Sequence, residues 1–221
     1  MPRDDYVRRL IAEMGRAWAR IVALIRARQF PAARIAAEQA IPQLLGLSVD
    51  NARTFSPPEL IARLMIGEAP EEGRDKCVAL VALLKALGDI TSAEGDADTG
   101  AEDHRRSLDL LLTTLAQNPD YTPPDYAPTV DELVEALAMY RLPVATNQLL
   151  IGYYEHRGAY ARAEDALFEM LEGSAGDAQL LAFGREFYRR LLRQSDARLA
   201  AGNLTRREVE AGLSELRRYT V

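Results

Sequence analysis

Apolar residues recur along this chain at steps of three and four, the spacing that places side chains on one face of an α-helix. The clearest example is the stretch from Asn147 to Gly173. Its apolar positions form two runs on either side of a short turn: Leu149, Leu150, Tyr153 and Tyr154, then Ala163, Leu167, Met170 and Leu171. Gly158 stands where the first run should end, because glycine adopts without strain the left-handed conformation that closes a helix. The stretch predicts an antiparallel helical hairpin, with the small Ala163 at the crossing.

The N-terminal part of the chain repeats this pattern. An apolar stripe predicts one long helix over residues 4–28. The opposite side of that helix carries arginines: Arg9, Arg16 and Arg20. After a turn, a second helix is expected from Pro31, which suits a first helical position, to about Leu45, with a kink at Pro42. Three residues match the later hairpin in register: Phe30 with Tyr160, Ala33 with Ala163, and Ile41 with Leu171.

The most apolar helix is predicted from Asp75 to about Ala93, after an acidic turn at residues 69–73. Apolar residues cover most of its circumference, which is typical of a central, buried helix. They are Cys77, Val78, Leu80, Val81, Leu83, Leu84, Leu87 and Ile90. A turn at residues 95–100 and a leucine-rich helix follow, so we expect a third hairpin with Gly100 in the crossing position.

The crossing positions Ala33, Gly100 and Ala163 lie 67 and then 63 residues apart. A period of this length indicates one extra helix beside each hairpin. Three similar helix starts support this interpretation, each a Ser or Thr followed three residues later by Glu, as in a capping box. They are Ser56–Glu59, Thr129–Glu132 and Thr205–Glu208.

The remaining segments are connectors and one further helix. Residues 46–55 predict a connector, and the four prolines of residues 118–128 exclude regular helix there. We expect Tyr121 and Tyr126 to anchor that loop. Residues 177–201 predict one long helix, and no segment predicts a strand.

The composition changes this picture little. Apolar residues make up 48% and charged residues 27% of the chain, the balance of an ordinary globular protein. No apolar run approaches the roughly 20 residues that span a bilayer. Acids stand near the N-terminus, where a signal peptide would carry bases. We therefore expect a cytoplasmic protein that does not interact with membranes.

The net charge of −6 is unevenly distributed. Residues 1–45 hold eight arginines and four acids, residues 46–140 seven bases and eighteen acids, and residues 141–221 twelve arginines and eleven acids, so the segments carry +4, −11 and +1. The acidic middle argues against nucleic acid as a partner. The basic N-terminal segment could contact phosphates, but a solvated helix face explains it better.

A few residues are candidates for chemistry, and each has a simpler structural interpretation. We expect His104 to be a partly buried packing residue, His156 a solvated one, and Cys77 a small hydrophobic residue. The acidic stretch from Glu94 to Asp103 lacks the Gly and Glu that an EF-hand loop requires, so it predicts a hairpin turn. The sequence also has no phosphate-binding loop, zinc-binding histidine pair or nucleophile elbow. We expect no catalytic residue, no metal site and no cofactor.

The hairpin at residues 147–173 resembles a tetratricopeptide-type unit, with a tyrosine in the first helix, Gly-x-Tyr at the turn and a small residue at the crossing. The whole chain also resembles a bacterial family of unknown function whose members are helical and tetratricopeptide-like. Three segments carry that likeness: DYVRRLI at 5–11, RLP at 141–143 with YYEHRGAYARAEDALFE at 153–169, and LLRQSDARLAAGNLTRREVEAGL at 191–213. The resemblance implies a fold and no activity.

Some tetratricopeptide proteins hold the terminal carboxylate of a peptide with Lys and Asn side chains in their groove. The matching positions in this chain are Val22, Lys85, Asp89, Gly152 and Glu155. Asp89 and Glu155 would repel a carboxylate, and the asparagines are missing. We therefore do not expect this carboxylate clamp.

These patterns predict an all-α protein: a single domain over residues 1–221, with about ten helices in a short solenoid or curled bundle. Because tetratricopeptide-like units mediate contacts, the expected function is a non-enzymatic interaction or scaffold module for a protein or peptide partner that the sequence does not identify. The alternative is an enzyme or small-ligand sensor with a site inside the bundle. A buried polar cluster around a pocket would favour that alternative.

The first predicted helix is about 15 Å longer than its partner, at ~1.5 Å per residue. The overhang carries an apolar stripe: Val7, Leu10, Ile11 and Met14. We expect another surface to pack against this stripe and shield it from solvent. One candidate is the helix predicted at residues 177–201, and the other is the same surface of a second copy, because two-fold homodimers are common. Of the two, we favour a homodimer through the N-terminal helix.

Overall fold

The computed structural model describes the backbone at residues 2–172 and 176–218, and the side chains at residues 12–172 and 176–216. Over these residues the chain forms twelve α-helices, ten of them with seven or more residues, and no strand. The prediction of an all-α fold with about ten helices is therefore confirmed.

Contacts divide the chain into two compact units, residues 1–140 and 141–221. Each unit buries its own set of apolar side chains. A single domain over the whole chain stays a prediction, and so does its arrangement as a solenoid or curled bundle.

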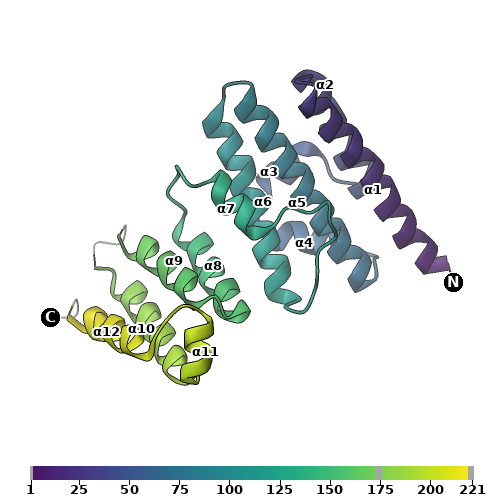
Figure 1. The fold of residues 1–221 in the computed structure, drawn as a ribbon. Coiled ribbons are helices and arrows are strands. Elements are labelled where there is room, and N and C mark those ends of the chain that lie inside the picture. Colours follow the sequence, from purple (N-terminus) through teal and green to yellow (C-terminus); the bar gives the residue numbers. More distant parts are fainter. Residues whose placement is uncertain (1, 173–175, 219–221) are drawn as a thin grey trace. The chain divides into compact units, whose positions relative to one another are not determined.

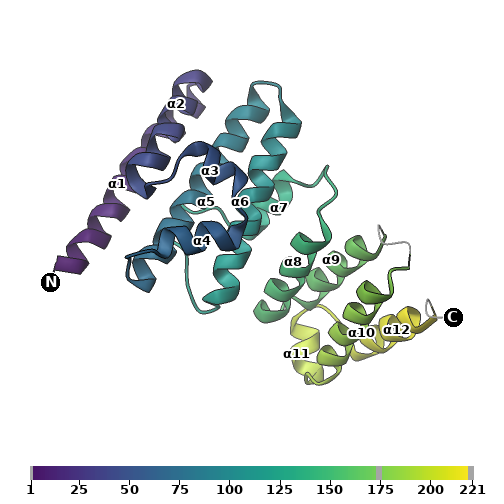
Figure 2. The same cartoon turned by 180° about the vertical axis from the view of Figure 1, so that it is seen from behind.

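The first unit contains α1 to α7 and one π-helical turn (Figure 1). Their bounds are α1 Pro2–Arg26, α2 Phe30–Ala40, η1 Ile41–Leu45, α3 Val49–Thr54, α4 Pro57–Met65, α5 Pro70–Ala93, α6 Ala97–Gln117 and α7 Val130–Ala136. α5 and α6 pair with each other, α2 and α4 pack against α5, and α7 packs against α6. Figures 1 and 2 both place the α1–α2 hairpin at the edge of this unit, and Figure 2 shows α4 lying across the α5–α6 pair.

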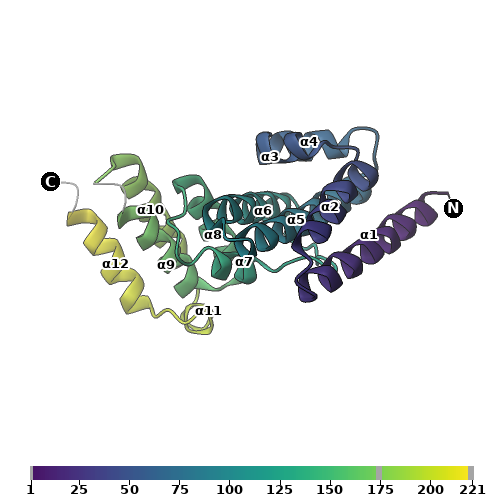
Figure 3. The same ribbon diagram turned by 90° about the horizontal axis from the view of Figure 1, so that it is seen from above.

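The second unit contains the remaining helices. Their bounds are α8 Val144–Arg157, α9 Tyr160–Glu172, α10 Ala178–Leu192, α11 Asp196–Ala201 and α12 Arg206–Arg218. α8 and α9 form the predicted hairpin: Gly158, with φ of 72°, ends α8, and Ala163 is fully buried between the helices. α12 packs along α10, as Figure 3 shows.

The helix predicted at residues 177–201 is divided in two, so that prediction is wrong. α10 ends at Leu192, and α11 begins at Asp196. The break arises because the Ser195 side chain accepts a hydrogen bond from the backbone N–H of Arg198 and caps a new helix.

The α5–α6 hairpin forms the core of the first unit and crosses on two glycines. The buried side chains of α5 include Val78, Leu80, Val81, Leu83, Leu84, Leu87 and Ile90. A Cβ on Gly100 would lie 2.8 Å from the carbonyl oxygen of Gly88, and a Cβ on Gly88 would lie 2.8 Å from that of Gly100. Only glycine permits so close a crossing.

α5 begins at Pro70 rather than at Asp75, so the predicted acidic turn at residues 69–73 is wrong. Proline fits the first turn of a helix because its missing N–H has no partner there. Glu71 and Glu72 also lie in that first turn, where the positive end of the helix dipole stabilises acids.

The α1–α2 hairpin is confirmed, and the predicted kink at Pro42 takes the form of a π-helical turn. α2 ends at Ala40, and the wider turn η1 runs to Gly46, whose φ of 67° closes the segment. Proline has no N–H to donate and its ring displaces the carbonyl four residues earlier, which favours the wider turn.

All three predicted capping boxes form, and they open α4, α7 and α12. In each, the Glu side chain accepts the N-cap backbone N–H: Ser56 to Glu59 at 2.8 Å, Thr129 to Glu132 at 2.7 Å and Thr205 to Glu208 at 2.7 Å. The short helix α3 was not predicted. It lies within the expected connector, where the Ser48 side chain caps it by accepting from the Asn51 N–H at 3.1 Å.

The proline-rich segment 118–128 has no regular helix, as predicted. The Tyr121 hydroxyl donates to Asp75 Oδ1 at 2.8 Å, and the Arg74 guanidinium lies 4.0 Å from the centre of the Tyr121 ring. Burial raises the pKa of the neighbouring Tyr126 to about 12. The loop is therefore anchored on α5 through Tyr121.

Candidate functional site

A hollow of ≈340 Å³ lies between α1 and the α2–η1 segment. We call it the α1–α2 trough. It is lined by Glu13, Arg16, Ala17 and Arg20 from α1, and by Ala36, Gln39, Ala40, Gln43 and Leu44 from α2 and η1. Both sets recur at steps of three and four residues, so each is one face of its helix.

Small residues form the floor of the trough. Ala36 and Ala40 are buried at the contact with α1, and Ala17 lies across from them, half-buried. On its other faces α1 buries Met14 and Ile21 completely, which fixes the orientation of the helix. Because alanine side chains are short, the two helices leave a channel open between their longer polar side chains.

The rim carries two arginines on one side and two glutamines on the other. Arg16 and Arg20 are exposed and one turn apart on α1. Gln39 and Gln43 are exposed on the opposite wall, and Gln43 belongs to the π-helical turn. π-Helical turns occur frequently at functional sites.

The two arginines of the trough form no ion pair with any side chain in the described ranges 12–172 and 176–216. Like charges at this spacing destabilise a helix by roughly 0.2–0.5 kcal/mol. Arg34 of the same hairpin behaves differently, because it pairs with Glu94 and donates to the Thr91 hydroxyl at 3.1 Å. The rim of the trough is therefore basic, and no side chain that the structure describes neutralises it.

The positions expected to match a tetratricopeptide groove are occupied differently. Lys85 Nζ lies 2.6 Å from Asp89 Oδ2, and His104 Nε2 lies 3.0 Å from Asp89 Oδ1. Burial alone would raise the pKa of the Asp89 carboxyl, but the hydrogen bonds to His104 and Lys85 outweigh burial and hold that pKa below its ordinary value. Lys85 is thus already paired with a carboxylate inside the chain.

The other three groove positions do not add a binding group to this cluster. Val22 is half-buried on α1. Glu155 belongs to the second unit, where Arg190 holds it by two nitrogens, with its shortest contact at 2.7 Å. Gly152 is exposed on the same helix, with no other group near it. The charge of Glu155 is therefore neutralised within its own unit.

The remaining candidates for chemistry occupy structural positions. His104 is buried and bound to Asp89, and His156 is exposed, as expected. Cys77 is buried on α5, and burial raises the pKa of its thiol to about 12, so the reactive thiolate is scarce.

The acidic stretch before α6 is the predicted hairpin turn. Asp96 caps α6 by accepting from the Thr99 N–H at 3.1 Å. Asp103 binds Arg53 of α3 at 3.0 and 2.7 Å. Within the described side chains, no group of three or more His, Cys, Asp or Glu residues could hold a metal ion. None of the described helices is long and apolar enough to cross a membrane.

Sequence reasoning had assigned Arg16 and Arg20 to a solvated face and had not singled out Gln39 or Gln43. The hairpin itself was predicted, but the sequence did not show which faces of α1 and α2 meet and bring the two rims together. The spacing of the alanines on both helices is the only signal in the sequence that could have indicated the trough.

The chain matches the model of a protein family described as "Family of unknown function (DUF6483)" over residues 1–220. The chain belongs to this family. No curated protein and no solved structure matches it. The expected membership in a family of unknown function is confirmed, and the match carries no activity that could be transferred to these residues.

Proposed function

We propose that the chain is a non-enzymatic interaction module that binds a protein partner in the α1–α2 trough. The observation that carries this proposal is the pair Arg16 and Arg20, which is open to solvent above an alanine floor and not neutralised by any described side chain. Solvent-exposed charged groups that no described side chain neutralises, on a hairpin at the edge of its unit, are suited to recognise a partner of opposite charge.

The alternative of an enzyme or small-ligand sensor has less support. The groups best suited to chemistry are engaged elsewhere: the Cys77 thiol is buried, and the His104 ring is held by Asp89. Among the residues that the structure describes, the trough is lined by arginine, glutamine, alanine and leucine with one acid, Glu13, and by no histidine, cysteine, serine or threonine. Such a lining can bind a partner but offers no nucleophile paired with a base.

The proposal includes a tetratricopeptide-like character for the three hairpins and a cytoplasmic location. The hairpins α1–α2, α5–α6 and α8–α9 each place a small residue at the predicted crossing position: Ala33, Gly100 and Ala163. Ala33 and Ala163 are fully buried, and Gly100 contacts α5 directly. This shared feature supports, for all three, the type of unit that the α8–α9 stretch resembles.

A homodimer through the N-terminal helix is part of this proposal. Met14 is fully buried within the chain, so it does not need a second copy to cover it. The side chains of Val7, Leu10 and Ile11 lie outside the described residues. Val7→Asp combined with Ile11→Asp should convert a dimer into a folded monomer, measured by light scattering and circular dichroism. A wild-type protein that remains monomeric at high concentration would contradict the dimer.

The interaction function is tested by affinity capture from the native host. Wild-type protein should retain a protein that mass spectrometry identifies, and the purified pair should bind with a defined stoichiometry in isothermal titration calorimetry. A chain that retains no macromolecule but carries a stoichiometric small molecule in native mass spectrometry would contradict the proposal. That outcome would favour the sensor alternative.

A further inference from the structure

We infer that the partner of the α1–α2 trough is an acidic amphipathic helix of another protein. Its carboxylates pair with Arg16 and Arg20, and its small or apolar side chains rest on the alanine floor. This inference rests on the proposed function and names the chemistry of the partner.

The spacing of the two arginines sets the spacing of the partner's acids. Residues four apart on one helix are separated by about 6 Å along the axis, at ~1.5 Å per residue. A second helix lying along α1 presents two acids at the same distance when they too are four residues apart. Arg16 and Arg20 therefore select two Glu or Asp residues on one helical face rather than a single carboxylate.

The floor favours a helix over a bulky compact ligand. Helices pack with their axes 8–10 Å apart, and the distance depends on the side chains between them. Ala17, Ala36 and Ala40 keep the distance between the axes of α1 and α2 short. A third helix can therefore rest on the surface groove that the two helices form. The volume of ≈340 Å³ is at the lower end for pockets that enclose a small molecule. It suits the side chains of one helical face, as in other grooves that bind amphipathic helices.

The lining also sets the order of charges along the partner helix. Glu13 lies at the end of the trough beyond Arg16, so the charges along α1 run negative, positive, positive from Glu13 to Arg20. A helix antiparallel to α1 matches them with Glu at i, Glu at i+4 and Lys at i+7. Gln39 and Gln43 on the opposite wall can both donate and accept hydrogen bonds, which suits the polar edge of the same helix.

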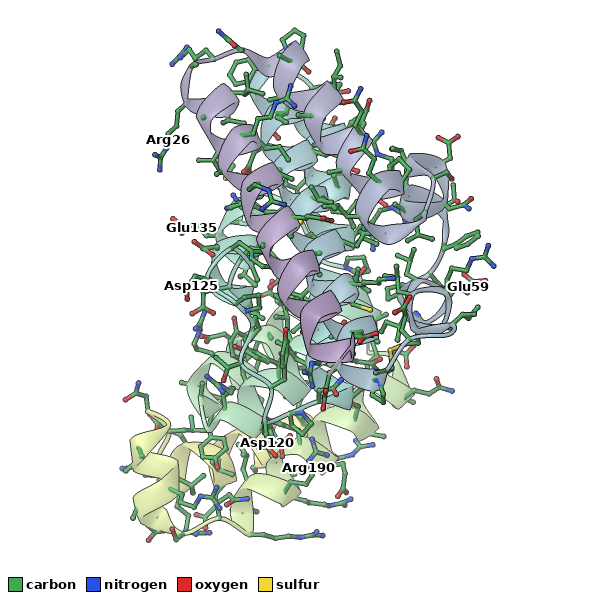
Figure 4. All side chains as sticks on the ribbon, turned by 90° about the vertical axis from the view of Figure 1, so that its right-hand side faces the viewer. Arg26, Glu59, Asp120, Asp125, Glu135 and Arg190 are labelled. Atoms are coloured by element: carbon green, nitrogen blue, oxygen red, sulfur yellow. The ribbon has the colours of Figure 1, made fainter. Side chains whose placement is uncertain are left out.

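The charge distribution of the chain favours a protein over a nucleic acid. The trough has two arginines and one acid, whereas binding to a phosphate backbone needs an extended basic surface. The residues that follow, 46–140, carry a net charge of −11. Exposed acids of this segment include Asp120, Asp125 and Glu135, which are labelled in Figure 4. A polyanion that extends beyond the trough would contact this acidic surface directly, while a short helix that contacts only the trough would not.

The test uses the full chain and a fluorescein-labelled helical peptide of about 20 residues, long enough to be helical in water. The peptide carries the Glu, Glu, Lys pattern on an alanine and leucine face. Fluorescence anisotropy measures its affinity for wild-type protein and for Arg16→Glu with Arg20→Glu. The double variant should bind about tenfold more weakly or worse, because two charge pairs become repulsive. A peptide with Lys in place of the two Glu residues should recover affinity for the double variant.

Two further variants separate charge from shape. Arg26→Glu is the matched control, because Arg26 is exposed on α1, does not line the trough and points away from the helix pair in Figure 4. It should bind the acidic peptide like wild type, apart from a small change common to any loss of positive charge. Ala17→Trp keeps every charge and fills the trough, so it should prevent binding while circular dichroism stays unchanged.

Several outcomes would overturn the inference. Equal binding by wild type and the double variant would show that the trough is not the site, and a failure of wild type to bind any acidic helix would show that the partner chemistry is wrong. Tighter binding to duplex DNA than to the peptide would indicate a nucleic acid. A fall in molecular mass in the double variant would assign the trough to a second copy. A captured partner whose affinity is unaffected by the double variant would leave the interaction function standing and remove this inference alone.

Discussion

The α5–α6 and α1–α2 hairpins follow the same plan of two antiparallel helices, but they close differently. α5 and α6 cross on Gly88 and Gly100 and bury apolar side chains over most of the circumference of α5. The charges beside that crossing are paired, as in the cluster of Asp89 with its two partners. α1 and α2 instead meet over alanines and leave a channel whose two arginines pair with none of the described side chains.

The difference shows that hairpins of one plan can bury the surface beside their crossing to different extents. Glycine lets the backbones approach until nothing fits between them, so the α5–α6 pair serves as a core. Between α1 and α2, the longer side chains beside the alanines form the walls of a groove, whereas Ala163 between α8 and α9 is fully buried. A small residue at the crossing is therefore not enough to leave a groove, and the longer side chains around it decide the outcome.

The largest expected effect comes from placing the same large side chain in a sealed crossing and in the trough. Ala163 is fully buried between α8 and α9, so Ala163→Trp should overpack and cost roughly 1–3 kcal/mol or more. Ala17→Trp enters the open trough and should cost less than Ala163→Trp, because Ala17 is only half-buried. Thermal melts of both variants measure this. Equal melting temperatures would mean that the α8–α9 register is wrong.

Smaller changes in the free energy of unfolding are expected from two Gly→Ala variants, one destabilising and one stabilising. A Cβ on Gly100 would lie 2.1 Å from Ser92 Oγ and 2.8 Å from the Gly88 carbonyl oxygen, so Gly100→Ala should cost about 1–3 kcal/mol. Gly15 in α1 has nothing within 4 Å of the same position, so Gly15→Ala should gain up to about 1 kcal/mol from helix propensity. Urea unfolding of the two variants gives both free energies. A stabilising Gly100→Ala would contradict the close crossing.

The starts of the second helices provide a third comparison. The Asp96 side chain caps α6, whereas Gln29 at the start of α2 makes no side-chain cap. Asp96→Ala should therefore lower the free energy of unfolding by ~1 kcal/mol. Gln29→Ala should stay within about 0.5 kcal/mol of wild type. If both changes cost the same, the difference between the two caps would not hold in solution.

Local signals were enough to predict the helices and most of their ends. Each capping box is contained within four residues, and the Gly158 turn is contained within three. The residue types at these neighbouring positions are therefore enough to predict both features. The start of α5 was missed because Pro70 followed by two acids suits a turn as well as a helix start. The break before α11 was missed because the apolar pattern continues through Ser195, and only the cap interrupts it.

The trough could not be predicted in the same way, because it depends on two segments at once. Arg16 and Arg20 have the pattern of a solvated helix face, and nothing near them in the sequence distinguishes them from Arg9. Gln39 and Gln43 are unremarkable until α2 is placed beside α1. That neither arginine pairs with a described side chain is a property of the folded unit, which no local spacing reveals.

The smallest effect concerns two carboxylates whose environments should give opposite pH dependence. Asp89 accepts hydrogen bonds from Lys85 and His104, and its pKa is lowered from 3.8. Glu164 in the second unit has its pKa raised from 4.5 by burial, although the Tyr188 hydroxyl donates to it at 2.7 Å. One carboxylate is thus stabilised as the anion, and the other as the neutral acid.

The sign of each contribution follows from linkage between folding and proton binding. For Asp89, stabilisation is present above pH 3.8 and is lost as the pH falls through the lowered pKa. For Glu164, it is present below pH 4.5 and is lost as the pH rises through the raised pKa. Asp89→Asn should therefore lower the melting temperature at neutral pH, with a deficit that shrinks in acid. Glu164→Gln, which keeps an acceptor for Tyr188, should gain on wild type as the pH rises above 4.5. Melting curves across this range would contradict the assignment if the two variants showed slopes of the same sign relative to wild type.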